Sequence, residues 1–131
     1  MRVTRTLLIG AALLLLGTSL SARAEVHEVS MSGFTFVPDM ISIAPGDSVH
    51  WVNSTQTIHT VTSGEDCSAD GLFDSGNLEP DDEFGYRFDE EGDYPYFCIP
   101  HCGSGMTGRI EVEEDTAVET ETWGRIRSLY R

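Results

Sequence analysis

The stretch Cys98-Ile99-Pro100-His101-Cys102-Gly103-Ser104-Gly105-Met106 places a thiol, an imidazole and a thioether in one short segment, spaced C-x2-H-x4-M. Its glycines and serine indicate a tight turn rather than a regular helix. A thiolate together with imidazoles binds zinc or copper, but structural zinc sites use four strong Cys or His ligands. A weak axial Met instead completes a trigonal copper site. The stretch therefore predicts Cys98, His101 and Met106 as copper ligands.

A second imidazole is required to complete such a site, and His59 is the best placed. It lies in a short apolar run at 58–62, upstream of the ligand stretch. His27 lies near the predicted mature N-terminus, and His50 lies on the opposite strand face from Trp51, which predicts a surface position. We therefore expect His59 as the fourth ligand, in the His2Cys set with axial Met that is typical of electron-transfer copper.

Short runs with alternating apolar and polar residues surround these ligands and predict β-strands. They lie at 26–31, 34–37, 41–43, 48–53, 58–62, 84–88, 94–98 and 107–112. Turn residues such as Ala44-Pro45-Gly46-Asp47 separate them, and no useful window shows a helical period. The pattern predicts an all-β protein, an antiparallel β-sandwich of seven to eight strands. The connection 63–83 is rich in Gly, Asp, Ser and Pro, so we expect it to be mostly loop.

The N-terminus has the features of a secretory signal peptide. Arg2 and Arg5 precede an apolar run at 7–17, which is too short to span a bilayer comfortably, and Ala22-Arg23-Ala24 is a small-x-small cleavage site. We therefore predict a signal peptide at 1–24, one domain at 25–115 and a C-terminal tail at 116–131. The mature protein is expected to be secreted or periplasmic, outside the cytoplasm.

The charge of the chain is strongly negative. It has 22 acidic residues, all after residue 24, against eight Arg and no Lys, for a net charge of −14. Such a surface repels phosphate, so we exclude nucleic acid as a partner. Two interpretations of the acidity stay open: attraction of a basic partner, and solubility at high salt.

The same residues resemble a known family. Segment 94–108 resembles the C-terminal copper loop of plastocyanins, and segment 46–53 followed by His59-Thr60-Val61 resembles their middle strands and upstream ligand. Phe34-x-Phe36-x-Pro38 resembles their early strand, so that the similarity spans about 26–112. The family that these segments resemble is the cupredoxins, the plastocyanin-like and pseudoazurin-like blue copper proteins. The resemblance implies a Greek-key β-sandwich that carries single electrons.

The resemblance also implies roles for the ligands and for the partners. His59, Cys98 and His101 would bind one copper ion that alternates between Cu(I) and Cu(II), with Met106 as the long axial ligand. The ring edge of His101 would reach solvent and serve as the route for electrons. The partner would be a redox protein such as a cytochrome, oxidase or reductase, docked to a monomer of this chain. If the acidic surface serves docking rather than solubility, that partner has a basic docking face.

Two other functions stay open. A copper-delivery protein without redox traffic could use the same ligands. An enzyme is disfavoured, because a substrate would need the ligand position that Met106 fills, and because no phosphate loop or serine elbow is present.

Three positions depart from the family pattern or bear on the surroundings of the copper ligands. Thr60 replaces a common Asn, but its N–H can still reach the thiolate sulfur and its hydroxyl can still brace the ligand loop. Pro100 has no N–H and cannot add a hydrogen bond to the thiolate. Phe97 stands where plastocyanins often present an exposed Tyr, so the family's remote route of electron entry is not carried over.

The two remaining cysteines have two interpretations. The plastocyanin pattern does not require Cys102, and the loop that holds Cys67 should lie at the same end of the sandwich. We therefore expect a Cys67–Cys102 disulfide, which leaves Cys98 as the one free thiolate. The alternative is a binuclear copper site, since Cys98-x3-Cys102 fits its spacing, but that site needs His at the position of Met106.

Overall fold

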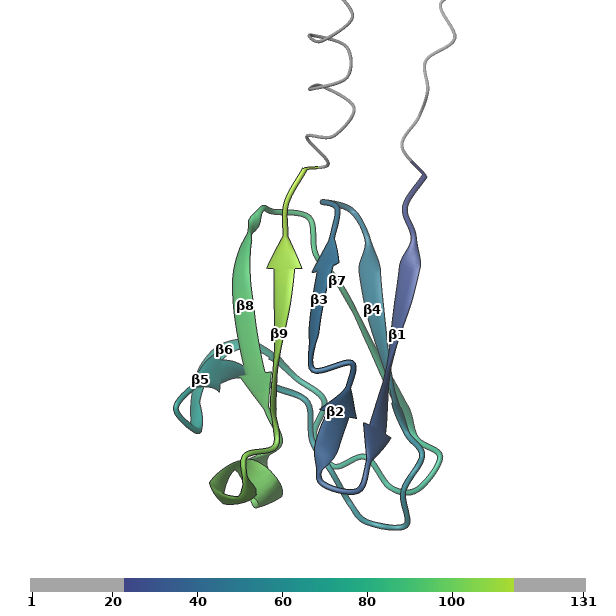
Figure 1. Cartoon of the computed structure of the whole chain (residues 1–131), viewed down its shortest axis with the longest axis vertical. Coiled ribbons are helices and arrows are strands. Elements are labelled where there is room, and N and C mark those ends of the chain that lie inside the picture. The colour runs from purple at the N-terminus through teal and green to yellow at the C-terminus, as the bar shows by residue number, and fades with distance from the viewer. Residues whose placement is uncertain (1–22, 115–131) are drawn as a thin grey trace, which may run out of the picture.

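Two β-sheets pack face to face in the computed structural model, which describes residues 23–114 (Figure 1). The first sheet has the order β2-β1-β4-β7, with β1 at Val26–Ser32, β2 at Thr35–Val37, β4 at Ser48–Asn53 and β7 at Glu83–Arg87. The second has the order β3-β9-β8-β5-β6, with β3 at Met40–Ile43, β5 at Thr62–Glu65, β6 at Ser68–Asp74, β8 at Gly92–Phe97 and β9 at Thr107–Val112. A short 3-10 helix, η1, spans Ile99–Ser104. The predicted tail and most of the predicted signal peptide lie outside the described residues.

The predicted β-sandwich is confirmed, but its detail differs in strand direction and number. The structure has nine strands, and both sheets are mixed, because β1 pairs with β4 and β3 pairs with β9 in parallel. Antiparallel pairing is dictated only for strands joined by a short hairpin, and each parallel pair is separated by chain that crosses to the other sheet. Alternation of apolar residues identifies a strand but does not encode its direction.

The connection 63–83 is not mostly loop, and this expectation was wrong. Strands β5 and β6 form a hairpin there, whose turn residues Asp66 and Cys67 have φ of 52° and 60°. Positive φ at both central residues is typical of the two-residue turns that suit hairpins. All of β6 except Phe73 is exposed, so its polar composition resembles a loop. Conversely, the expected strand at 58–62 begins only at Thr62, and His59 makes an isolated bridge with Leu78.

Aromatic side chains fill the space between the sheets. Trp51 and Tyr96 are fully buried, with their rings 5.4 Å apart, and Phe36 packs 4.7 Å from Tyr96. Large buried rings in edge-to-face contact stabilise a core and fix its geometry. Because Tyr96 lies near the end of β8, this packing gives a rigid base to the loop that follows. Among residues 23–114, no helix has the length and apolarity needed to cross a membrane.

Asp47 is a buried carboxylate that fastens the start of β1 to the turn before β4. Its oxygens accept hydrogen bonds from the backbone N–H of Glu25 at 2.9 Å, from that of Ala44 at 3.1 Å and from His27 Nε2 at 2.8 Å. Burial by itself favours the protonated acid, but these hydrogen bonds outweigh it and hold the pKa of Asp47 below its ordinary value. Asp47 is therefore ionised at neutral pH.

This pKa predicts acid sensitivity that depends on Asp47. A carboxylate with a lowered pKa stabilises the folded state at pH values above its unfolded pKa of about 3.9, and that contribution is lost as the pH falls toward the folded pKa. We expect the free energy of unfolding of the wild type to exceed that of Asp47→Asn above about pH 5, with the gap closing below about pH 4. Urea unfolding across this range measures it. A gap that stays constant down to pH 2 would contradict the role of Asp47.

Candidate metal centre

His59, Cys98 and His101 come together at one end of the sandwich, and Met106 lies in the same loop as Cys98 and His101. His59 lies between β4 and β5, Cys98 directly follows β8, and the other two lie before β9. Figure 1 shows the short helix after β8 at the same end as the β1–β2 turn. The loop is closed by its backbone, because Cys98 N–H donates to Met106 O at 3.1 Å and Met106 N–H donates to His101 O at 3.2 Å. Gly105 ends η1 in the left-handed conformation, with φ of 84°, which glycine adopts without strain.

Three donor atoms of this group form a small triangle. Cys98 Sγ lies 3.6 Å from His59 Nδ1 and 3.4 Å from His101 Nδ1, and the two nitrogens lie 3.1 Å apart. A point equidistant from the three atoms is about 2 Å from each, which is the length of a bond from a metal to nitrogen. His59 and Cys98 are fully buried and His101 is half-buried.

The chemistry of these donors fits copper. Two imidazole nitrogens and one thiolate in a trigonal arrangement are typical of electron-transfer copper sites, where Met is a weak axial ligand. Met106 is fully buried in the same loop. One copper ion is therefore the metal that this set of side chains suits.

The electrostatics of His59 favour its metal-binding form. Burial lowers the pKa of His59, and the charge that a protonated His101 would carry lowers it further. His59 is then neutral at physiological pH, and the neutral imidazole is the form that binds metal ions.

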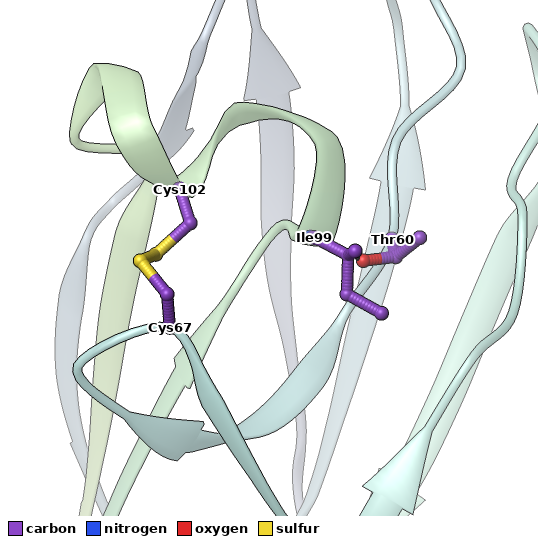
Figure 2. The surroundings of a disulfide bond; sticks show 4 residues. All are labelled: Thr60, Cys67, Ile99 and Cys102. Atoms are coloured by element: carbon purple, nitrogen blue, oxygen red, sulfur yellow. Dashed lines mark hydrogen bonds between the residues drawn. A yellow bond between two sulfur atoms is a disulfide. The ribbon is translucent and has the colours of Figure 1, made fainter.

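Thr60 connects the two segments of the site as expected. Its backbone N–H donates to Cys98 Sγ at 3.4 Å, and its hydroxyl oxygen accepts the N–H of Ile99 at 2.8 Å. Figure 2 shows Thr60 against Ile99, directly after the thiolate residue. Pro100 follows in the first turn of η1, where the missing N–H of proline is tolerated. Both contacts expected of Thr60 are therefore present, and its role as a brace stays a prediction.

Removing the Thr60 hydroxyl should weaken this brace. Thr60 is buried, so Thr60→Val leaves the Ile99 N–H without its partner, and we expect a loss of about 1–3 kcal/mol in the free energy of unfolding. Thr60→Ser keeps the hydroxyl and is the matched control. Chemical unfolding of the three copper-free proteins measures the difference. Equal stability of the Val and Ser variants would contradict the brace.

The predicted disulfide is present. Cys67 and Cys102 are bonded, with 5.8 Å between their Cα atoms, and Cys98 is the free cysteine. Figure 2 shows the bond joining the β5–β6 turn to η1, the helix that carries His101. Cys102 therefore has no free thiolate for a second copper ion, which excludes the binuclear interpretation.

The other positions weighed from the sequence are now placed. His27 pairs with Asp47, and His50 lies 3.5 Å from Glu83, so neither joins the metal centre. Phe97 is buried, with 3% of its surface exposed, and it offers no contact surface to a partner.

One residue of the site was missed. The ring of Phe34, from the β1–β2 turn, lies 4.6 Å from the ring of His101 and is still half-exposed. In the sequence Phe34 stands two residues before Phe36, within the run expected to be a strand at 34–37, so the period-two pattern places it on the same buried face as Phe36. In the structure Phe34 lies in the turn before β2, and no signal in the sequence marks it as a neighbour of His101.

Comparisons with known proteins identify the relatives of this chain. Residues 23–113 match the family model of copper binding proteins, plastocyanin/azurin family. The chain is 34% identical to chloroplastic plastocyanin from Tetradesmus obliquus over 107 residues, which cover 74% of each protein. It is 32% identical to a putative pseudoazurin from Rhizobium leguminosarum bv. viciae over 116 residues, covering 84% of the chain and 75% of that protein. The purple cupredoxin from Nitrosopumilus maritimus superposes with a TM-score of 0.59 and 25% identity, covering 66% of the chain and 99% of that structure.

Proposed function

The chain belongs to the plastocyanin/azurin family of copper-binding proteins, and on this premise we propose that it is an exported carrier of single electrons whose copper ion is held by His59, Cys98, His101 and Met106. One observation carries the proposal: two imidazole nitrogens and one thiolate sulfur converge within 3.6 Å of one another, with His59 and Cys98 buried and His101 half-buried. Copper bound there supplies a one-electron couple between Cu(I) and Cu(II).

The protein contributes a site that is already assembled. The Thr60 N–H donates to the Cys98 sulfur and stabilises its negative charge, while the loop hydrogen bonds fix the positions of His101 and Met106. Met106 would be the weak fourth ligand of the copper ion, which would leave no ligand position for a substrate. These contacts hold the ligand side chains in place without the metal. The side chains would therefore move little when a bound copper ion changes between Cu(I) and Cu(II), as an electron carrier requires.

The surface around His101 suits brief contact with a partner. Phe34 packs on its ring, and the neighbouring Ile99 and Pro100 are exposed, so an apolar face surrounds the half-buried imidazole. Transient redox complexes use small interfaces of this kind. We assign electron entry and exit to this face, in a monomer.

Acidic residues next to this face indicate the charge of the partner. Glu65, Asp66 and Asp70 lie on the β5–β6 hairpin, which the disulfide ties to η1. They would attract a partner with a basic docking face, which we propose to be a cytochrome, an oxidase or a reductase. The disulfide also supports a location outside the cytoplasm, where such bonds persist.

Repeated redox cycling separates electron transfer from copper delivery. We expect the copper-loaded protein to be reduced and reoxidised many times by a small mediator while it keeps its copper in the presence of a Cu(I) chelator. The buried, braced ligands are the reason, since release would require the loop to open. Absorbance of the oxidised protein after each cycle, with copper analysis of the protein fraction, measures retention. Transfer of copper to the chelator on the first reduction would favour delivery instead.

A further inference from the structure

A second group of metal-binding atoms lies at the far end of β1 from the metal centre, where β1 begins (Figure 1). The carboxylates of Glu25 and Asp47 and the imidazole of His27 each offer one ligand atom, and these atoms all lie within 4.8 Å of one another. Glu25 and His27 are two residues apart in extended chain, so both side chains lie on the same face.

Each carboxylate oxygen of Asp47 contacts one nitrogen of this group. Its Oδ1 lies 2.9 Å from the backbone nitrogen of Glu25, and its Oδ2 lies 2.8 Å from His27 Nε2. Two ligand atoms that sit at right angles, each about 2 Å from a metal, are about 2.8 Å apart. The hydrogen-bonded spacing is therefore also the spacing of adjacent ligands around one metal ion.

Signal-peptide removal changes the chemistry of this group. Cleavage after Ala24 converts the backbone nitrogen of Glu25 from an amide, which has no basic lone pair, into a free amine. The amine, His27 Nε2 and the Asp47 carboxylate then form a set of two nitrogens and two oxygens, with the exposed Glu25 carboxylate beside it. Nitrogen and oxygen ligands in a tetragonal arrangement favour Cu(II), which also has the highest affinity among the divalent first-row metals.

We propose that the mature N-terminus is a second copper site, which binds Cu(II) through the Glu25 amine, the His27 imidazole and the Asp47 carboxylate. The inference rests on the proposed export and cleavage, and not on the proposed electron transfer. The second site contains no thiolate, so Cu(II) bound there gives a weakly coloured, tetragonal centre that differs from the one at Cys98.

The test is a Cu(II) titration of the exported, mature protein, with its N-terminus identified by mass spectrometry. We expect one equivalent to produce the intense absorption of a thiolate-bound copper, and a second to produce a tetragonal paramagnetic resonance signal without adding to that absorption. His27→Ala should lower the affinity for the second equivalent by at least about tenfold and leave the first unchanged. Acetylating the Glu25 amine should also lower the affinity for the second equivalent and leave the first unchanged.

His50→Ala is the matched control, since His50 is another half-exposed histidine beside a carboxylate, that of Glu83. It should leave both equivalents unchanged. A tetragonal signal of undiminished affinity in His27→Ala or in the acetylated protein would overturn the second site, as would a mature chain that begins at a residue other than Glu25. Absence of the intense absorption alone would instead contradict the proposed function, so the two failures are distinguishable.

Discussion

Cys98→Ser should abolish the intense visible absorption of the copper-loaded protein, together with its reversible one-electron couple. The absorption arises from charge transfer between the thiolate and copper, and Cys98 is the free cysteine among the described residues. A serine hydroxyl is not ionised at neutral pH and cannot replace the thiolate as a ligand. Any copper that His59 and His101 still hold would show only the weak bands of a nitrogen and oxygen site. Visible spectroscopy and voltammetry measure both losses.

The matched control for this variant is Met106→Leu, which removes the proposed axial ligand but keeps the thiolate. We expect it to retain the intense absorption and to raise the reduction potential, because a weak ligand that favours Cu(II) is lost. Far-UV circular dichroism establishes that both variants are folded. Survival of the intense absorption in folded Cys98→Ser would refute the proposed ligand set.

Replacing both Cys67 and Cys102 with serine should produce the largest loss of stability. The bond closes a loop over a sequence separation of 35, and the loss of that constraint on the unfolded chain corresponds to about 4 kcal/mol. Guanidinium unfolding of the copper-free protein, with the double variant compared against the oxidised wild type, measures the change. Reduced wild-type protein should behave like the double variant. Equal midpoints for the oxidised and reduced proteins would contradict a stabilising bond.

The same variant should also bind copper less tightly. The disulfide ties η1, which carries His101, to the β5–β6 hairpin, so its removal frees one side of the loop that the metal must otherwise organise. Ordering that loop on binding then costs part of the binding free energy. Competition with a chelator of known affinity measures this effect, and an unchanged affinity would show that the backbone hydrogen bonds alone preassemble the site.

The β-sandwich could be predicted from the alternation of apolar and polar residues, whereas the pairing of its strands could not. Strands such as β4 carry a buried residue at every second position, and this pattern is legible in the sequence. The β5–β6 hairpin was missed because β6 buries only Phe73, so its strand character comes from edge pairing rather than from burial. The parallel pairs of β1 with β4 and of β3 with β9 depend on how the chain crosses between sheets, which local composition does not encode.

The site was predictable where ligand spacing lies within one loop. Cys98, His101 and Met106 are close in the sequence, so a single turn suffices to bring them together. The Cys67–Cys102 bond was also predictable, because an odd cysteine count left one thiol for the metal. Contacts between distant parts of the chain were not predictable. Phe34 contacts His101 from the β1–β2 turn. Asp47 contacts Glu25 and His27 from a distant turn. Such contacts depend on the packing of separate elements.

Anomalous diffraction at the copper edge from crystals loaded with Cu(II) tests the metal centre most directly. We predict a strong peak inside the triangle of His59 Nδ1, Cys98 Sγ and His101 Nδ1, about 2 Å from each atom, with Met106 as the next nearest donor. Copper bound elsewhere, with these three atoms making hydrogen bonds only to one another, would contradict the proposed site and the electron transfer that depends on it.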